Sequence, residues 1–126
     1  MTRLKTAARF LFAAFFIAAG INHFVNPAFY VGIMPPYLPW HLALVYVSGV
    51  AEIVLGAMLC FRRWMALAGW GLIALLIAVF PANIHMALNP ELYAPLSPVG
   101  LWIRLPIQFL LIAWAWAYTR RARQVD

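Results

Sequence analysis

Two ionisable side chains, those of Glu52 and Arg104, lie inside long apolar segments, whereas nearly every other charge lies in a flank. A charge inside hydrocarbon costs at least a few kcal/mol unless it is paired, protonated or hydrated, so it marks a candidate functional site. The chain has only three acidic residues, three histidines and one cysteine, so few other groups could carry out chemistry. We therefore predict a site built on Glu52 and Arg104, joined by Gln108 four residues after Arg104 on the same helix face.

Other polar groups recur at helical spacing in the remaining apolar segments. Ser48, Glu52 and Gly56 lie four residues apart, a small polar face typical of a helix packed against other helices. Amide and imidazole groups near the ends of the first and third segments are candidate binding residues: Asn22, His23, Asn83 and His85. Asn83 and His85 are separated by about 200° around a helix, so they cannot both point inward.

The depth of each group suggests which side chains can meet. At 1.5 Å per residue, Glu52 lies roughly 16 Å below the outer start of its helix, Gln108 roughly 13 Å and Arg104 roughly 7 Å. We expect a polar pocket in the outer half of a helix bundle, with Glu52 at its floor. Glu52 then contacts Arg104 directly, through Gln108 or through water. Two simpler interpretations remain open: Arg104 extends alone to the headgroups, or Glu52 is a protonated acid that only joins helices.

The composition places the chain in a bilayer. Hydrophobic residues make up 67% of its 126 residues and charged residues 10%, more apolar surface than one soluble core of this size can bury. Four segments approach the roughly 20 apolar residues that a spanning helix needs. We predict an all-α integral membrane four-helix bundle, one domain over 1–126, with helices at about 7–25, 40–61, 64–88 and 99–119.

Basic residues set the expected orientation. Eight of the nine form three clusters, which precede the first segment, separate the second from the third and follow the fourth: Arg3, Lys5 and Arg9; Arg62 and Arg63; Arg120, Arg121 and Arg123. The positive-inside rule then places both termini in the cytoplasm, with the protein in the cytoplasmic (inner) membrane. The alternative, a cleavable signal peptide ending near Ala18-Ala19-Gly20, would leave an odd number of spans. The sequence shows no basic helix face that also carries polar residues able to contact nucleic-acid bases, so we do not expect nucleic-acid binding.

Two further patterns accompany the segments. Asn26-Pro27 ends the first and Asn89-Pro90 the third, each shortly after a histidine, which suggests two parallel helical-hairpin repeats or simply a common terminator. Aromatic residues gather near the segment ends as interfacial anchors, on the outer side Tyr30, Tyr37, Trp40, Tyr93 and Trp102, and on the inner side Trp64, Trp114, Trp116 and Tyr118.

Four short motifs, one in each apolar segment, together resemble the DoxX family of small bacterial four-helix membrane proteins, which includes relatives of the DoxD subunit of thiosulfate:quinone oxidoreductase. They are Gly20-Ile21-Asn22-His23-Phe24 with Asn26-Pro27, Ser48-Gly49-Val50-Ala51-Glu52 followed by Gly56, Asn83-Ile84-His85-Met86-Ala87, and Arg104-Leu105-Pro106-Ile107-Gln108. The resemblance covers about 8–119. It implies a membrane subunit beside a quinone pool, serving the oxidation of sulfur compounds or thiol-linked redox with a soluble oxidoreductase partner.

The polar residues are compatible with that chemistry. Gln108, Arg104 or a histidine could donate hydrogen bonds to a quinone, and Glu52 could carry the proton. We expect no metal and no covalently bound cofactor; a haem between His23 and His85 is not favoured, because nothing else marks a macrocycle pocket. Cys60 is single, which excludes an intrachain cysteine-pair mechanism.

Two other classes of function remain open. One is a transporter or binding protein for lipophiles that uses Glu52, as small multidrug exporters use one membrane glutamate. Those carry the acid in the first helix, however, and Arg104 would neutralise a site for cations. The other is an assembly partner without chemistry, whose polar groups only set the helix register.

Overall fold

The computed structural model describes residues 2–34, 36, 38–93 and 97–124, and within them it is all-helical, with no strand. Four helices are long and apolar enough to cross a membrane: α1 (Thr2–Val25), α3 (His41–Met58), α4 (Arg62–Leu88) and α5 (Pro98–Gln124). Two shorter elements follow α1 and α4, namely α2 (Pro27–Ile33) and the 3-10 helix η1 (Pro90–Tyr93). The predicted all-α class with four spanning helices is confirmed, and the chain is a multi-pass membrane protein.

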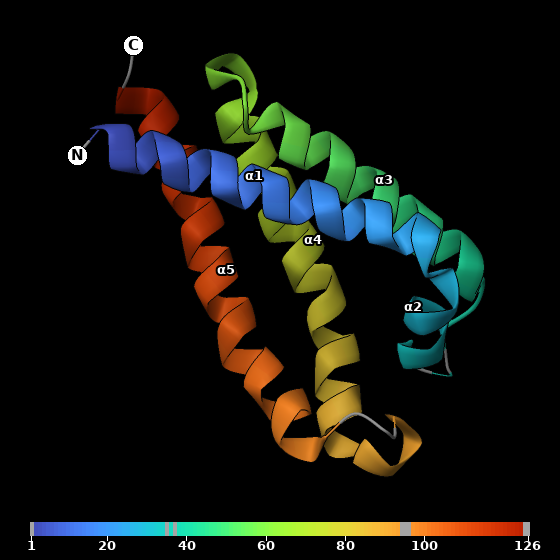
Figure 1. Cartoon of the computed structure of the whole chain (residues 1–126). Coiled ribbons are helices and arrows are strands. Elements are labelled where there is room, and N and C mark those ends of the chain that lie inside the picture. Colours follow the sequence, from blue (N-terminus) through green and yellow to red (C-terminus); the bar gives the residue numbers. More distant parts are fainter. Residues whose placement is uncertain (1, 35, 37, 94–96, 125–126) are drawn as a thin grey trace.

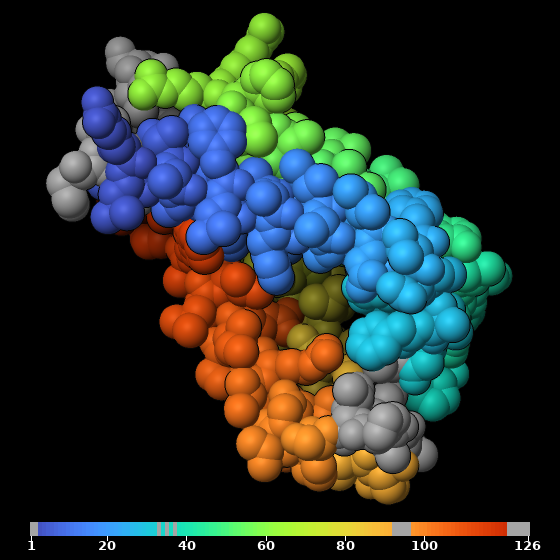
Figure 2. All heavy atoms as spheres, viewed as in Figure 1, coloured from blue at the N-terminus to red at the C-terminus, as the bar shows by residue number. Residues whose placement is uncertain are grey.

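The long helices form two antiparallel pairs, α1 with α3 and α4 with α5 (Figure 1). The pairs meet at the end that holds both termini and the turn between α3 and α4, which we call the basic end because Arg3, Arg62 and Arg120 lie exposed there. They spread apart toward the opposite end, called here the open end. Figure 2 shows the resulting hollow between α1 and α5, with α4 behind it.

The main hydrophobic core lies where the two pairs meet. Phe12 of α1 is fully buried, and its ring centroid is 4.4 Å from that of Trp114 and 5.8 Å from that of Tyr118. Trp114 Nε1 donates a 2.7 Å hydrogen bond to the Tyr118 hydroxyl. Tyr118 was predicted to be an interfacial anchor, but it is fully buried, because its position on α5 faces α1 rather than lipid.

The outward faces of the long helices remain apolar and exposed, as contact with lipid requires. Among the predicted anchors, Trp40, Trp64, Trp102 and Trp116 are exposed. Two other predicted anchors, Tyr37 and the side chain of Tyr93, lie outside the described part of the structure. α3 is the shortest spanning helix, with 18 residues, about 27 Å in length. It ends at Met58, earlier than the predicted 61, because Leu59 to Phe61 form a tight turn in which Phe61 N–H donates to the Met58 carbonyl.

Both Asn-Pro pairs end a spanning helix and begin a short one. Asn26 has φ −127° and ψ 58°, and Asn89 has φ −130° and ψ 57°. The following proline disfavours the helical region for the residue before it, so each asparagine breaks the helix and Pro27 or Pro90 starts the next turn. The local likeness agrees with two hairpins of similar design; their origin as repeats stays a prediction.

Candidate functional site

Glycines bring α1 and α3 into close contact and so position the candidate site. A methyl group on Gly20 would lie 2.6 Å from the carbonyl oxygen of Gly49, and one on Gly49 would lie 2.8 Å from the Cβ of His23. One on Gly56 would meet Ile17 at 2.9 Å. Because these positions lack a Cβ, the two backbones approach closely enough for short polar side chains on one helix to reach the other.

His23 and Glu52 form a salt bridge across this contact. His23 Nε2 lies 2.8 Å from Glu52 Oε2, and the two side chains are 11% and 13% exposed. An ionisable residue inside an apolar helix needs a partner, and this contact provides one for Glu52 and largely withdraws it from lipid. The small exposed fraction leaves the pair accessible to water or a small ligand.

The other ring nitrogen of His23 is held by α3. Nδ1 lies 2.9 Å from the Val45 carbonyl oxygen and 3.1 Å from Ser48 Oγ, and the Ser48 hydroxyl donates to the same carbonyl at 3.0 Å. A carbonyl oxygen only accepts, so Nδ1 carries a hydrogen in this arrangement. Nε2 and Glu52 Oε2 then share a single further proton, held as a carboxylic acid facing neutral imidazole or as a carboxylate facing imidazolium.

Residues of α2 and the end of α1 cover the pair at the open end. The Tyr30 ring packs against the His23 ring, with centroids 4.0 Å apart and planes at 32°. Asn22 Nδ2 donates to the Tyr30 hydroxyl at 2.7 Å, and Asn26 Nδ2 donates to Asn22 Oδ1 at 2.8 Å. Asn22 therefore orients the tyrosine over the imidazole.

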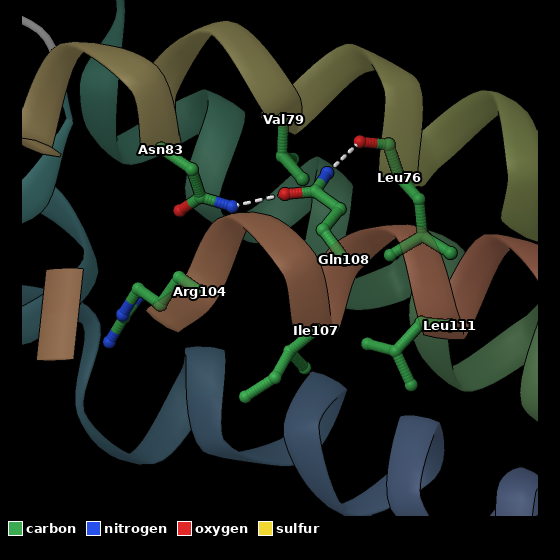
Figure 3. A pocket seen from close by; sticks show the side chains of 7 residues that line it. All are labelled: Leu76, Val79, Asn83, Arg104, Ile107, Gln108 and Leu111. Atoms are coloured by element: carbon green, nitrogen blue, oxygen red, sulfur yellow. Dashed lines mark hydrogen bonds between the residues drawn. The ribbon is translucent and has the colours of Figure 1, made fainter. Parts of the chain in front are cut away.

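A second polar cluster joins α4 to α5 (Figure 3). Asn83 Nδ2 donates to Gln108 Oε1, and Gln108 Nε2 donates to the Leu76 carbonyl. Gln108 is buried, at 3% exposure. These bonds bring together two of the predicted site residues, but they tie them to the hairpin of α4 and α5 and not to Glu52.

Arg104 belongs to this second cluster. It lines a cavity of about 160 Å³ together with Asn83 and Gln108. No direct salt bridge joins it to Glu52, although both residues are described, and Glu52 pairs with His23 instead. A contact between Glu52 and Arg104 through water stays a prediction. His85 lies one turn before Asn89, whose Nδ2 is 3.4 Å from His85 Nδ1 and donates to its carbonyl at 3.0 Å.

The pairing of His23 with Glu52 was not predicted from the sequence, because it depends on where α1 ends along α3. His23 lies three positions before the Asn26 break, yet it bonds to Val45 and Ser48, well inside α3. α1 therefore ends about one turn short of the start of α3. His23 consequently lies deep enough to reach Glu52, whose side chain leans toward the beginning of α3.

Three participants were not assigned from the sequence. Ser48 was placed on the polar face without a role, Tyr30 was interpreted as an anchor, and the Val45 carbonyl carries no sequence signal. The proline in Asn26-Pro27 predicts a helix break, but only the structure shows that α2 brings the Tyr30 ring against His23 of α1.

The fold and the paired residues define a small multi-pass membrane protein with a histidine–carboxylate pair between two spanning helices. Residues 12–119 match the model of a family described as a domain of unknown function, DUF8561, and the chain belongs to that family. No curated protein and no solved structure matches the chain.

Proposed function

We propose that the protein is the membrane subunit of a quinone-linked oxidoreductase, and that the His23–Glu52 pair exchanges a proton with the quinone. The observation that carries this proposal is the 2.8 Å contact between His23 Nε2 and Glu52 Oε2. Few arrangements available to this chain can hold a titratable proton inside a membrane, and this one is fixed by the Val45 carbonyl and Ser48.

The chemistry requires both protons and electrons. Reduction of a quinone to a quinol consumes two electrons and two protons. The electrons come from a soluble oxidoreductase partner, since we assign no electron carrier to this chain. The pair donates its shared proton to one quinone oxygen and takes up another from water, and the second proton follows by the same route. Oxidation of a quinol runs these steps in reverse, with the pair as the proton acceptor.

Two sequence observations support this assignment. The motifs that resemble the DoxX family contain Gly20, His23, Glu52 and Gly56, the residues that form or permit the pair. The basic clusters of the chain flank the spanning helices, with Arg3, Arg62 and Arg120 exposed at the basic end, in agreement with cytoplasmic termini. With that orientation, the pair lies in the outer half of the inner membrane.

The proposal is tested by the quinone content of protein purified gently from native membranes. We expect quinone in the wild type and in Glu91→Gln, which removes an exposed acid outside the spanning helices. Glu52→Gln and His23→Gln should retain about tenfold less, as expected for loss of one charge-assisted hydrogen bond. Wild-type protein without quinone, or equal amounts in Glu52→Gln and Glu91→Gln, would overturn the proposal.

A second candidate function is proton-coupled transport of a lipophile. The hollow between the two hairpins favours it, because such a transporter needs both room for a lipophile and a proton-binding pair (Figure 2). Proteoliposomes discriminate the two functions: a transporter accumulates a lipophilic substrate in response to a pH gradient without any partner. An assembly partner without chemistry would show neither transport nor bound quinone, and Glu52→Gln would leave its complexes intact.

A further inference from the structure

Arg104 carries a positive charge that the described residues do not neutralise. Of the three acidic residues, Glu52 is paired with His23, Glu91 is exposed in η1, and Asp126, the last residue, lies outside the described part of the chain. Arg104 itself is partly buried and lines a cavity between α4 and α5. An arginine inside a spanning segment is costly without a counter-charge. The missing charge is therefore one that a ligand can supply.

The polar side chains that line the cavity offer more hydrogen-bond donors than acceptors, with the Asn83 oxygen as one acceptor among them. Arg104 has five N–H groups, while Asn83 and Gln108 each keep one amide hydrogen beyond those already bonded. The oxygen of Gln108 is occupied by Asn83. Such a set favours an anionic group that only accepts hydrogen bonds, and a carboxylate is one that arginine can bind through two parallel bonds.

The rest of the lining is aliphatic and continues along the two helices. Figure 3 shows Arg104 at one end, with Ile107 and Leu111 following it along α5 and Val79 and Leu76 on α4. A ligand that matches the whole cavity has a negative head at Arg104 and an apolar chain directed toward Leu111. At about 160 Å³ the cavity has room for a carboxylate and the first carbons of one chain.

We propose that this cavity binds a long-chain carboxylate, with its head on Arg104 and its chain between α4 and α5. The site lies on the hairpin that does not contain the His23–Glu52 pair. It is thus independent of the quinone proposal, and either can fail without the other.

The test measures binding of radiolabelled oleate to the protein in nanodiscs of phosphatidylcholine. Arg104→Gln should weaken binding about ten- to a hundredfold, the value of one charge-assisted pair. Arg104→Lys should retain part of it, because a lysine keeps the charge and loses the two-bond geometry. Arg62→Gln is the matched control, since it removes an exposed arginine of the α3–α4 turn, and it should bind oleate as the wild type does.

Competition on the wild type tests the ligand without any variant. Unlabelled oleate should displace the label, whereas methyl oleate, which has the same chain and no charge, should not. Equal displacement by methyl oleate would overturn the proposal, as would equal affinities of Arg104→Gln and Arg62→Gln. If phosphatidylglycerol displaces the label at lower concentrations than oleate does, the cavity binds a phospholipid, and the proposal of a carboxylate ligand is overturned.

Discussion

At the scale of single residues, His23 is fixed by contacts on three sides. Glu52 lies on one ring nitrogen, the Val45 carbonyl and Ser48 on the other, and the Tyr30 ring on the face. Contacts on both ring nitrogens and on the ring face fix the orientation of the imidazole between α1 and α3. The contact between His23 and Glu52 joins α1 to α3, and in the proposed function the same contact would also hold the exchanged proton.

The partner of Glu52 can be identified by a double-mutant cycle. His23→Ala and Glu52→Ala should each destabilise the protein by about 3 kcal/mol, because each leaves a buried polar group without its partner, and their coupling should be about 2 kcal/mol. Unfolding in mixed micelles of increasing SDS content measures these free energies. Arg104→Ala combined with Glu52→Ala is the control and should be additive; coupling in that cycle, with none between His23 and Glu52, would contradict the described pairing.

The hydroxyl of Tyr30 provides a finer test of the covering residues. Tyr30→Phe keeps the ring over His23 but leaves Asn22 Nδ2 without its acceptor, so we expect a loss of about 1 kcal/mol in the free energy of unfolding. Tyr46→Phe is a matched control, because the Tyr46 ring stacks on Phe24 and its residue is exposed. An equal effect of the two variants would mean that the bond between Asn22 and Tyr30 does not contribute.

At the scale of elements, each hairpin depends on close approach of its two helices. Gly20, Gly49 and Gly56 permit it between α1 and α3, and Gly69 permits it between α4 and α5, where an added methyl would lie 2.9 Å from the Ala115 carbonyl oxygen. The driving force between spanning helices is packing rather than water exclusion, so these contacts matter more than they would in a soluble bundle.

Gly20→Ala should separate α1 from α3 and weaken the His23–Glu52 contact. Its methyl would meet backbone atoms that cannot move aside, so we expect a loss of about 2 kcal/mol, typical of overpacking. Gly32→Ala has nothing within 4 Å and should be nearly neutral. Thermal unfolding of the two purified variants in detergent measures the difference, and equal stability would show that α1 and α3 tolerate a wider spacing.

Sequence patterns predict the elements better than their contacts. The four spanning helices and both Asn-Pro breaks follow from apolar length and from the chemistry of proline. Glu52, His23 and Gln108 could be recognised as polar residues that need partners. Their pairing could not be predicted, because it depends on where α1 ends relative to α3, a shift of about one turn that no residue encodes locally. The role of Tyr30 depends likewise on the direction of α2.

At the scale of the whole molecule, the charge distribution and the packing agree. The two hairpins meet through the core around Phe12 at the basic end and separate toward the open end. Packing between the hairpins is therefore concentrated where Arg3, Arg62 and Arg120 lie, while a smaller buried cluster of Met86, Ala87 and Leu101 packs α4 against α5.

The predicted orientation, with both termini in the cytoplasm, can be tested by cysteine labelling. In a Cys60→Ala background, Glu91→Cys and Arg62→Cys place single thiols at exposed positions at opposite ends of α4. With cytoplasmic termini, a membrane-impermeant maleimide should label Glu91→Cys in intact cells and Arg62→Cys only after permeabilisation. The reverse pattern would invert the topology and move the His23–Glu52 pair to the cytoplasmic half of the membrane. The proposed proton exchange would then face the cytoplasm, so this measurement determines on which side of the membrane the His23–Glu52 pair lies.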